Sequence, residues 1–109
     1  MTIITASTDD KKVLYKLTRD RSRTPMKKVS EVVEVQHYAI YTDVNNATGE
    51  VVQLATVMDN SGALFTTNSA TFIDDFAAIV EAFPDVERIR VEHMTSKKNR
   101  EFLTCSLAD

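Results

Sequence analysis

The sequence has few of the residues that support covalent or metal chemistry. Its 109 residues include one cysteine, Cys105, so no disulfide can form within the chain and no pair of cysteines can hold zinc. Only two glycines are present, without a glycine-rich phosphate loop, and His37 and His93 have no partner at metal-ligand spacing. We therefore expect no enzyme activity, no catalytic residue, no metal and no cofactor.

Long apolar runs are absent as well. No stretch approaches the roughly 20 apolar residues that a membrane-spanning helix needs, and the amino terminus lacks the pattern of a secretory signal. We expect a cytoplasmic protein without membrane contact. The hydrophobic fraction of 43% is enough for one modest core.

Basic residues are missing from the middle of the chain. Residues 31–87 contain ten acidic side chains and no lysine or arginine, whereas residues 1–30 carry eight basic side chains and residues 88–109 carry five. The net charge of −3 hides this segregation. The two basic blocks either form one face that binds a polyanion or are ordinary solvated surface.

Periodicity indicates a sequence of strands in the first two thirds of the chain. Residues 13–18 alternate weakly and predict a short strand, which an arginine-rich loop follows. Three segments rich in Val, Ile, Tyr or Thr predict further strands, and Asn and Gly between them predict turns. These strands are expected at 29–44, 51–58 and 63–68, with turns at 45–49 and 59–62.

The period changes after residue 68. Phe72, Phe76 and Phe83 recur at helical spacing and predict an amphipathic helix over about 70–83 with these rings in the core. Two more strands follow, at about 88–93 and 100–107, around a turn at 96–99. In the last strand alternation places Leu103, Cys105 and Leu107 on the core face and Phe102 on the other.

Three strands, one helix and two strands is the element order of the OB fold. This all-β fold with one helix is a five-stranded, partly open Greek-key barrel whose strand face and two loops bind oligonucleotides. We predict the barrel at residues 29–109. A basic arm at residues 1–28, carrying the additional short strand at about 12–18, precedes it.

Local motifs in this predicted barrel resemble those of a known family. They are the turn Asp59-Asn60-Ser61-Gly62-Ala63-Leu64-Phe65, the helix with Asp75-Phe76-Ala77-Ala78-Ile79-Val80, and Ser96-Lys97-Lys98-Asn99 before Phe102-Leu103. In order and spacing, over roughly residues 11–107, they are similar to the single-stranded DNA-binding proteins of small podophages that replicate linear DNA by protein priming. The resemblance implies a non-sequence-specific protein that coats and protects replicating strands. It also implies DNA contact at Tyr41 and Phe65, which match tyrosines of the family, whereas residues 45–48 lack the aromatic that the family has there.

Binding single strands requires cations for the phosphates and aromatic faces for the bases. Core packing is the alternative role for each aromatic ring. The predicted stacking residues are Tyr41, Phe65, Phe102, Tyr38 and Tyr15. The predicted phosphate-binding residues are Arg19, Arg21, Arg23, Lys27, Lys28, Arg90, Lys97, Lys98 and Arg100.

Single-stranded DNA is the expected partner, with replication proteins such as a polymerase as further candidates. The chain ends in Ser106-Leu107-Ala108-Asp109, so we expect no recruitment by the acidic tail with a terminal Phe that bacterial housekeeping binders use. The alternatives are an OB-like protein-interaction module and a phage-encoded inhibitor that mimics DNA. A DNA mimic should place carboxylates over its active face, whereas a binder should gather cations there.

Overall fold

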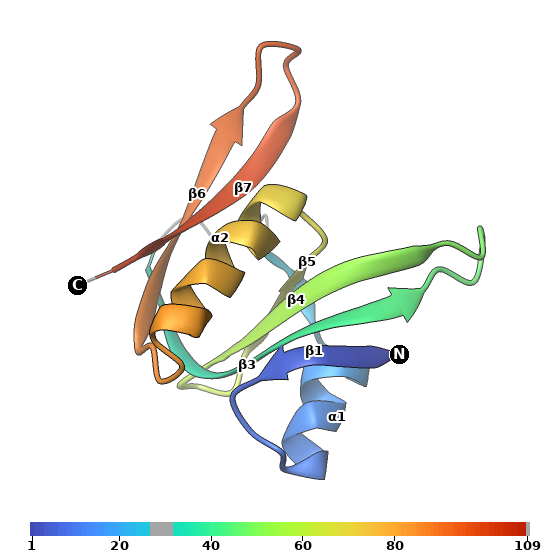
Figure 1. Ribbon diagram of the computed structural model, residues 1–109, viewed down its shortest axis with the longest axis vertical. Helices are drawn as coiled ribbons and strands as arrows, with labels where there is room; N and C mark the ends of the chain where they lie inside the picture. Colours follow the sequence, from blue (N-terminus) through green and yellow to red (C-terminus); the bar gives the residue numbers. More distant parts are fainter. Residues whose placement is uncertain (27–31, 109) are drawn as a thin grey trace.

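The structure is a computed structural model that describes residues 1–26 and 32–108. Within these residues the chain forms seven strands and two helices (Figure 1). In order they are β1 (Thr2–Ala6), α1 (Lys11–Arg19), β2 (Thr24–Pro25), β3 (Val32–Val44), β4 (Val51–Asp59), β5 (Leu64–Thr67), α2 (Ala70–Ala82), β6 (Arg88–Thr95) and β7 (Glu101–Leu107).

The strands form one curled sheet in the order β2-β5-β4-β3-β6-β7, with β1 beside β3. The long strand β3 joins the two halves of this sheet. Its residues 32–34 pair with β6, and from Val35 onward it pairs with β4. The register shifts between Val35 and His37, and such a bulge bends a strand, which allows β3 to serve both halves.

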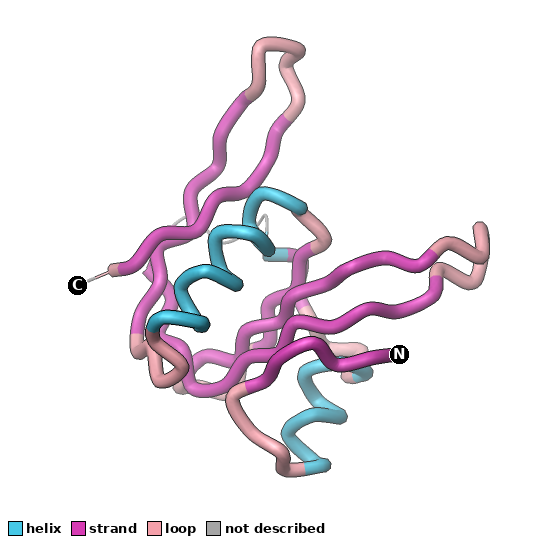
Figure 2. Tube along the Cα trace, viewed as in Figure 1, coloured by secondary structure: helices cyan, strands magenta, loops and turns pink. Residues whose placement is uncertain are grey.

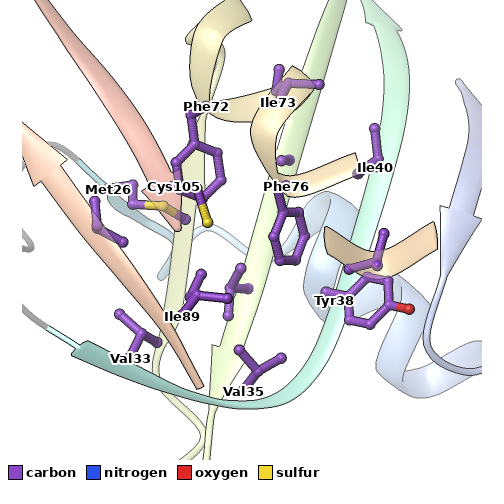
Figure 3. Packing of buried hydrophobic residues seen from close by; sticks show 14 of the residues in the cluster. Met26, Val33, Val35, Tyr38, Ile40, Phe72, Ile73, Phe76, Ile89 and Cys105 are labelled. Atoms are coloured by element: carbon purple, nitrogen blue, oxygen red, sulfur yellow. The ribbon is translucent and has the colours of Figure 1, made fainter. Parts of the chain in front are cut away.

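Each face of the sheet is covered by one helix. α2 contributes Phe72, Ile73 and Phe76 to the main core, against Val35 and Tyr38 of β3 (Figure 3). Alternate residues of β3 point to the opposite face of the sheet, as the two-residue period of a strand requires. There Ala39 and Tyr41 form a second cluster with Leu17 of α1.

The segment predicted as a strand at 12–18 is the helix α1, so that prediction is wrong. The Asp10 side chain caps the helix by accepting from the amides of Lys12 (2.9 Å) and Val13 (3.2 Å). Leu17 and Thr18 are buried, and Val13 packs against the same cluster, which is helical spacing. Docking on the sheet, which local alternation does not reveal, decides the conformation.

The fold therefore has two helices in its described part, where one was predicted. No element is predicted for residues 2–6, yet they form β1, and the run of β-branched Thr and Ile was the available signal. The helix predicted over 70–83 is confirmed as α2, and the strands predicted on either side of it are confirmed within a few residues. Residues 29–31 of the predicted first barrel strand lie outside the described residues.

Two apolar residues predicted to lie in the core are exposed instead. α2 ends at Ala82, and Phe83 takes the C-cap conformation, with φ −133° and ψ 78°, before Pro84. The chain turns there, which leaves the Phe83 side chain 50% exposed. Leu107, at the end of β7, is 49% exposed.

The sheet is a half-barrel with one open side. The strands predicted for the barrel pair as β5-β4-β3-β6-β7, in four antiparallel ladders. No ladder joins β5 to β7 among the described residues, and β5 instead pairs in parallel with the two-residue strand β2. The tube view shows the β3–β4 and β6–β7 hairpins diverging from this curled body (Figure 2). Neither helix of the described part is long and apolar enough to cross a membrane.

Candidate nucleic-acid interface

A groove of about 640 Å³ lies on the open side of the half-barrel. β7 lines one side with Phe102 and Leu103, and Met26 and Thr66 line it from the β2–β5 side. The first turn of α2 closes one end, and Leu54 of β4 also contributes. In Figure 1 these elements meet at the base of the angle between the β3–β4 and β6–β7 hairpins.

The N-cap residue of α2 and one residue within the helix form hydrogen bonds to the backbone of β7, on the edge that faces away from β6. The Ser69 hydroxyl donates to the Leu103 carbonyl (3.2 Å), and the Asp75 carboxylate accepts from the Cys105 amide (3.2 Å). Residues 103 and 105 are two apart, so these groups lie on the same edge of the strand. These two backbone groups therefore have hydrogen-bond partners although no strand of the described residues pairs with this edge of β7.

Phe102 is the predicted stacking residue that lines the groove. Its neighbours Leu103 and Cys105 are buried in the core, so Phe102 faces the other side of β7, as its position predicts. The side chain is half-buried. Its cross-strand partner Met94 is exposed and is not part of the groove lining.

Phe65 of β5, another predicted stacking residue, does not line the groove. Its ring is half-buried and packs against the main core. The neighbouring Thr66, on the opposite face of β5, lines the groove instead. Phe65 therefore presents less surface to a base than the family resemblance implies.

Tyr41 is 0% exposed and belongs to the cluster beneath α1. Its hydroxyl accepts from Arg23 Nη1 (2.6 Å) and shares a hydrogen bond with Thr56 Oγ1 (3.1 Å). Thr56 in turn donates to Thr66 Oγ1 (3.1 Å), so the network ends at the groove lining. The structure thus makes Tyr41 a support of the groove and leaves its ring no face for a base.

Tyr38 is 3% exposed and faces the opposite helix. Its ring meets that of Phe76 edge to face, with centroids 5.4 Å apart, and its hydroxyl donates to the Pro84 carbonyl (2.9 Å). Burial, with a contribution from Asp85, raises the pKa of Tyr38. As with Tyr41, core packing is the role that the structure supports.

Three predicted phosphate-binding residues surround the turn between β6 and β7. Lys97, Lys98 and Arg100 are exposed there. The Ser96 hydroxyl orders the turn by accepting from the amides of Lys98 (3.3 Å) and Arg100 (3.2 Å), and Asn99 adopts a positive φ of 58°. Glu101 and Phe102 of the groove follow directly in the chain, whereas none of these three cations lines the groove itself.

The amino-terminal arginines have neighbours within the chain. Arg19 forms a salt bridge with Asp43 (3.4 Å), and Arg23 Nε donates to the Asp20 carbonyl (2.8 Å) in addition to its bond to Tyr41. Hydrogen bonds from Ser22 lower the pKa of Asp20, with smaller contributions from nearby basic residues.

The remaining predicted cations lie elsewhere on the surface or outside the described residues, and no lysine or arginine of the described residues lines the groove. Arg21 is exposed near α1, and Arg90 is exposed on β6, opposite Ser106 of β7. Lys27 and Lys28 lie outside the described residues. The two basic blocks of the sequence are not gathered in one groove by the described part of the structure: the β6–β7 turn and α1 lie at opposite ends of the long axis in Figure 1.

Tyr15 is the accessible tyrosine of the three. It is 65% exposed on α1, beside Lys11, Lys12 and Lys16. The strand prediction placed it in the basic block correctly but gave it the wrong geometry, because on a helix the residues three and four positions earlier lie next to it. It lies far from Phe102 in the fold and cannot share its groove.

Sequence reasoning missed the apolar and small polar residues of the groove. Leu54 and Met26 carry no charge or aromatic ring, and Thr66 and Asn68 look like ordinary strand and turn residues. Their part in the site depends on which strand edges stay open. No local signal in the sequence contains that information.

The structure also bears on the metal site and the reactive cysteine considered from the sequence. No group of three or more His, Cys, Asp or Glu side chains is placed to hold a metal ion there. Cys105 is buried as predicted, and burial, assisted by Asp75, raises its pKa to about 12. A thiol with so high a pKa is almost entirely protonated at neutral pH.

Comparison with known proteins adds no relative: no family model, curated protein or solved structure matches the chain.

Proposed function

We propose that this protein is an OB-fold protein that binds single-stranded DNA without sequence specificity. The element order supports this fold, with β3 to β7 as the five barrel strands and α2 between the third and fourth. A partly open barrel is typical of the class. The position of the groove agrees with it too, since oligonucleotides bind OB folds on the face of the second and third strands, between two loops.

In this proposal the strand lies in the groove beside β7. A base stacks on Phe102, Leu54 provides further apolar surface, and Lys97, Lys98 and Arg100 neutralise phosphates as the strand leaves the groove. Stacking and phosphate contacts carry no sequence information, which fits a protein that coats and protects replicating strands in the cytoplasm. A polymerase working on the same strand is a further candidate partner.

The observation that carries the proposal is that β7, which lines the groove with Phe102, leads out of a turn with three exposed cations. Among the described residues that line the groove, Glu101 is the only acid. A protein that mimics DNA would place several carboxylates on this face, and the lining has one. The described lining has no lysine or arginine either, so in this proposal the cations of the turn supply the positive charge that a binder needs.

The test replaces Phe102 with Ala and measures the affinity for a labelled oligothymidine by fluorescence anisotropy. Loss of one stacked base should weaken binding by about 1–3 kcal/mol, roughly 5- to 150-fold. Met94→Ala is the matched control, because Met94 is the cross-strand partner of Phe102 but does not line the groove. Equal affinities of the two folded variants would contradict the proposed path of the strand. An absence of binding by the unaltered protein at low salt would reject the function itself.

A further inference from the structure

α1 presents a basic face with an exposed aromatic ring at its centre. Tyr15 lines a shallow hollow with Lys11, Lys12, Lys16 and Asp20. Arg19, further along the helix, forms a salt bridge with Asp43, whereas none of these three lysines forms an ion pair with an acidic side chain among the described residues. The helix therefore presents an apolar ring within positive charge.

The corner between α2 and β6 has the complementary character. Phe83 and Leu107 are half-exposed and border a hollow of about 330 Å³ that Asp85 and Glu87 also line. Arg88 lines the hollow as well and has an interaction within the chain. The corner adjoins the segment 31–87, which has no lysine or arginine. Polar and apolar groups both line this hollow, with Phe83 and Leu107 as its large apolar side chains and two acidic side chains against one basic.

The two surfaces of one molecule cannot meet. In Figure 1, α1 lies at the lower right, and the end of α2 lies at the left near the C-terminus, with the sheet between them. A contact between these surfaces therefore joins two copies through different faces. A contact of this heterologous kind repeats from copy to copy, as a ring or as an open chain.

We propose that the protein self-associates head to tail, with Tyr15 of one copy in the hollow between Phe83 and Leu107 of the next. A cavity of about 150 Å³ holds a benzene molecule, so the hollow has room for the ring. The lysines of α1 then face Asp85 and Glu87, and this charge complementarity fixes the orientation and selects a second copy as the occupant. The proposal does not rest on DNA binding, although a chain of copies would suit a protein that coats a strand.

The first measurement is sedimentation velocity of the full chain without DNA, over a range of concentrations. The average mass should rise with concentration at low salt. It should fall back towards that of the monomer near 1 M salt, where the Debye length is about 3 Å. Tyr15→Ala should weaken the association about tenfold or more, because a buried aromatic ring is typically an interface anchor. A protein that stays monomeric at low salt at every concentration, or a Tyr15→Ala variant that associates like the parent, would overturn the proposal.

Charge reversal then identifies the two faces. Lys12→Glu with Lys16→Glu makes the α1 face acidic, and Asp85→Lys with Glu87→Lys makes the corner basic. Each double variant alone should be monomeric, whereas an equimolar mixture should associate again, because each reversed face finds its complement on the other variant. Lys97→Glu with Lys98→Glu, the same charge change at the β6–β7 turn, is the control and should associate like the parent.

Association of either reversed variant alone, or a mixture that stays monomeric although both variants are folded by circular dichroism, would contradict the pairing of these faces. Because DNA is absent throughout, this result is separate from the test of DNA binding.

Discussion

At the scale of residues, the hydroxyl of Tyr41 connects separate parts of the molecule. It bonds to Arg23 from the loop after α1 and to Thr56 of β4, and it lies 3.4 Å from the carbonyl of Leu17 in α1. Tyr41 and Thr56 are both fully buried, so water cannot readily replace a lost partner. This one oxygen fastens α1 to the sheet that it covers.

Removing that oxygen should lower the stability of the protein and leave its affinity for DNA nearly unchanged. Tyr41→Phe should lower the free energy of unfolding by about 1–3 kcal/mol, because buried polar groups lose their partner. Urea unfolding measures this change, and Tyr15→Phe, which removes an exposed hydroxyl, is the control with little effect. A large loss of oligothymidine affinity with unchanged stability would mean that Tyr41 contacts DNA after all, as the family resemblance implies.

The accessible aromatic rings show why spacing alone does not assign roles. Phe102 is adjacent to the buried Leu103 in β7, and Phe83 comes three residues after the buried Val80 of α2. Both rings have accessible surface, for different reasons. Phe102 lies on the outer face of β7, whereas Phe83 lies where the helix ends. Alternation predicts the first case, and only the actual end of α2 reveals the second.

At the scale of elements, α1 depends on its cap and on its contact with the sheet. The helix has nine residues, and helices shorter than about 12–15 residues are marginal in isolation. Its N-cap, Asp10, satisfies two amides that would otherwise lack partners in the first turn. Leu17 at 0% exposure fixes the buried face.

Asp10→Ala should therefore destabilise the protein by about 0.5–2 kcal/mol, the usual cost of losing an N-cap. The adjacent Asp9→Ala removes the same charge without the cap and should change the free energy of unfolding much less. Thermal and urea unfolding of both variants provide the comparison. Equal effects would show that the negative charge near α1, and not the two hydrogen bonds, stabilises the helix.

At the scale of the whole molecule, the distribution of cations sets the expected salt dependence. The β6–β7 turn carries three exposed cations on the hairpin that lines the groove, while those of α1 lie at the other end of the long axis (Figure 1). The molecule measures 41 × 39 × 25 Å along its principal axes. A short strand in the groove should therefore meet the first group and not the second.

With three cations at phosphates, the slope of log K against log salt should be about −2, since each neutralised phosphate contributes about −0.7 for single strands. An oligothymidine of about eight nucleotides, within the 4–16 that an OB fold covers, restricts binding to one protein. Changing Lys97, Lys98 and Arg100 to Ala should flatten the slope and weaken oligothymidine and mixed sequences alike.

The matched triple variant with Ala at positions 11, 12 and 16 removes three lysines from α1 and should keep the slope. A slope steeper than about −3 would instead show that both basic blocks of the sequence meet the strand, as a single groove requires.

The central series of strands, the helix α2 and the buried thiol are predictable from local sequence patterns, because each has a strong local cause. The Phe72 and Phe76 spacing, the Asp59 and Gly62 turn, and the alternation around Cys105 are such causes. In the turn, the Asp59 carboxylate accepts from the amides of Ser61 and Ala63 (both 2.9 Å), and Gly62 adopts a φ of +88°.

Local patterns do not predict that residues 11–19 are helical, that Tyr38 and Tyr41 are buried, or that β5 and β7 leave a groove between them. These outcomes depend on contacts between segments far apart in the chain. Leu17 packs with Tyr41, and Ser69 and Asp75 bond the edge of β7. A local pattern contains no information about such partners, since burial and edge pairing are set by whatever the fold brings alongside.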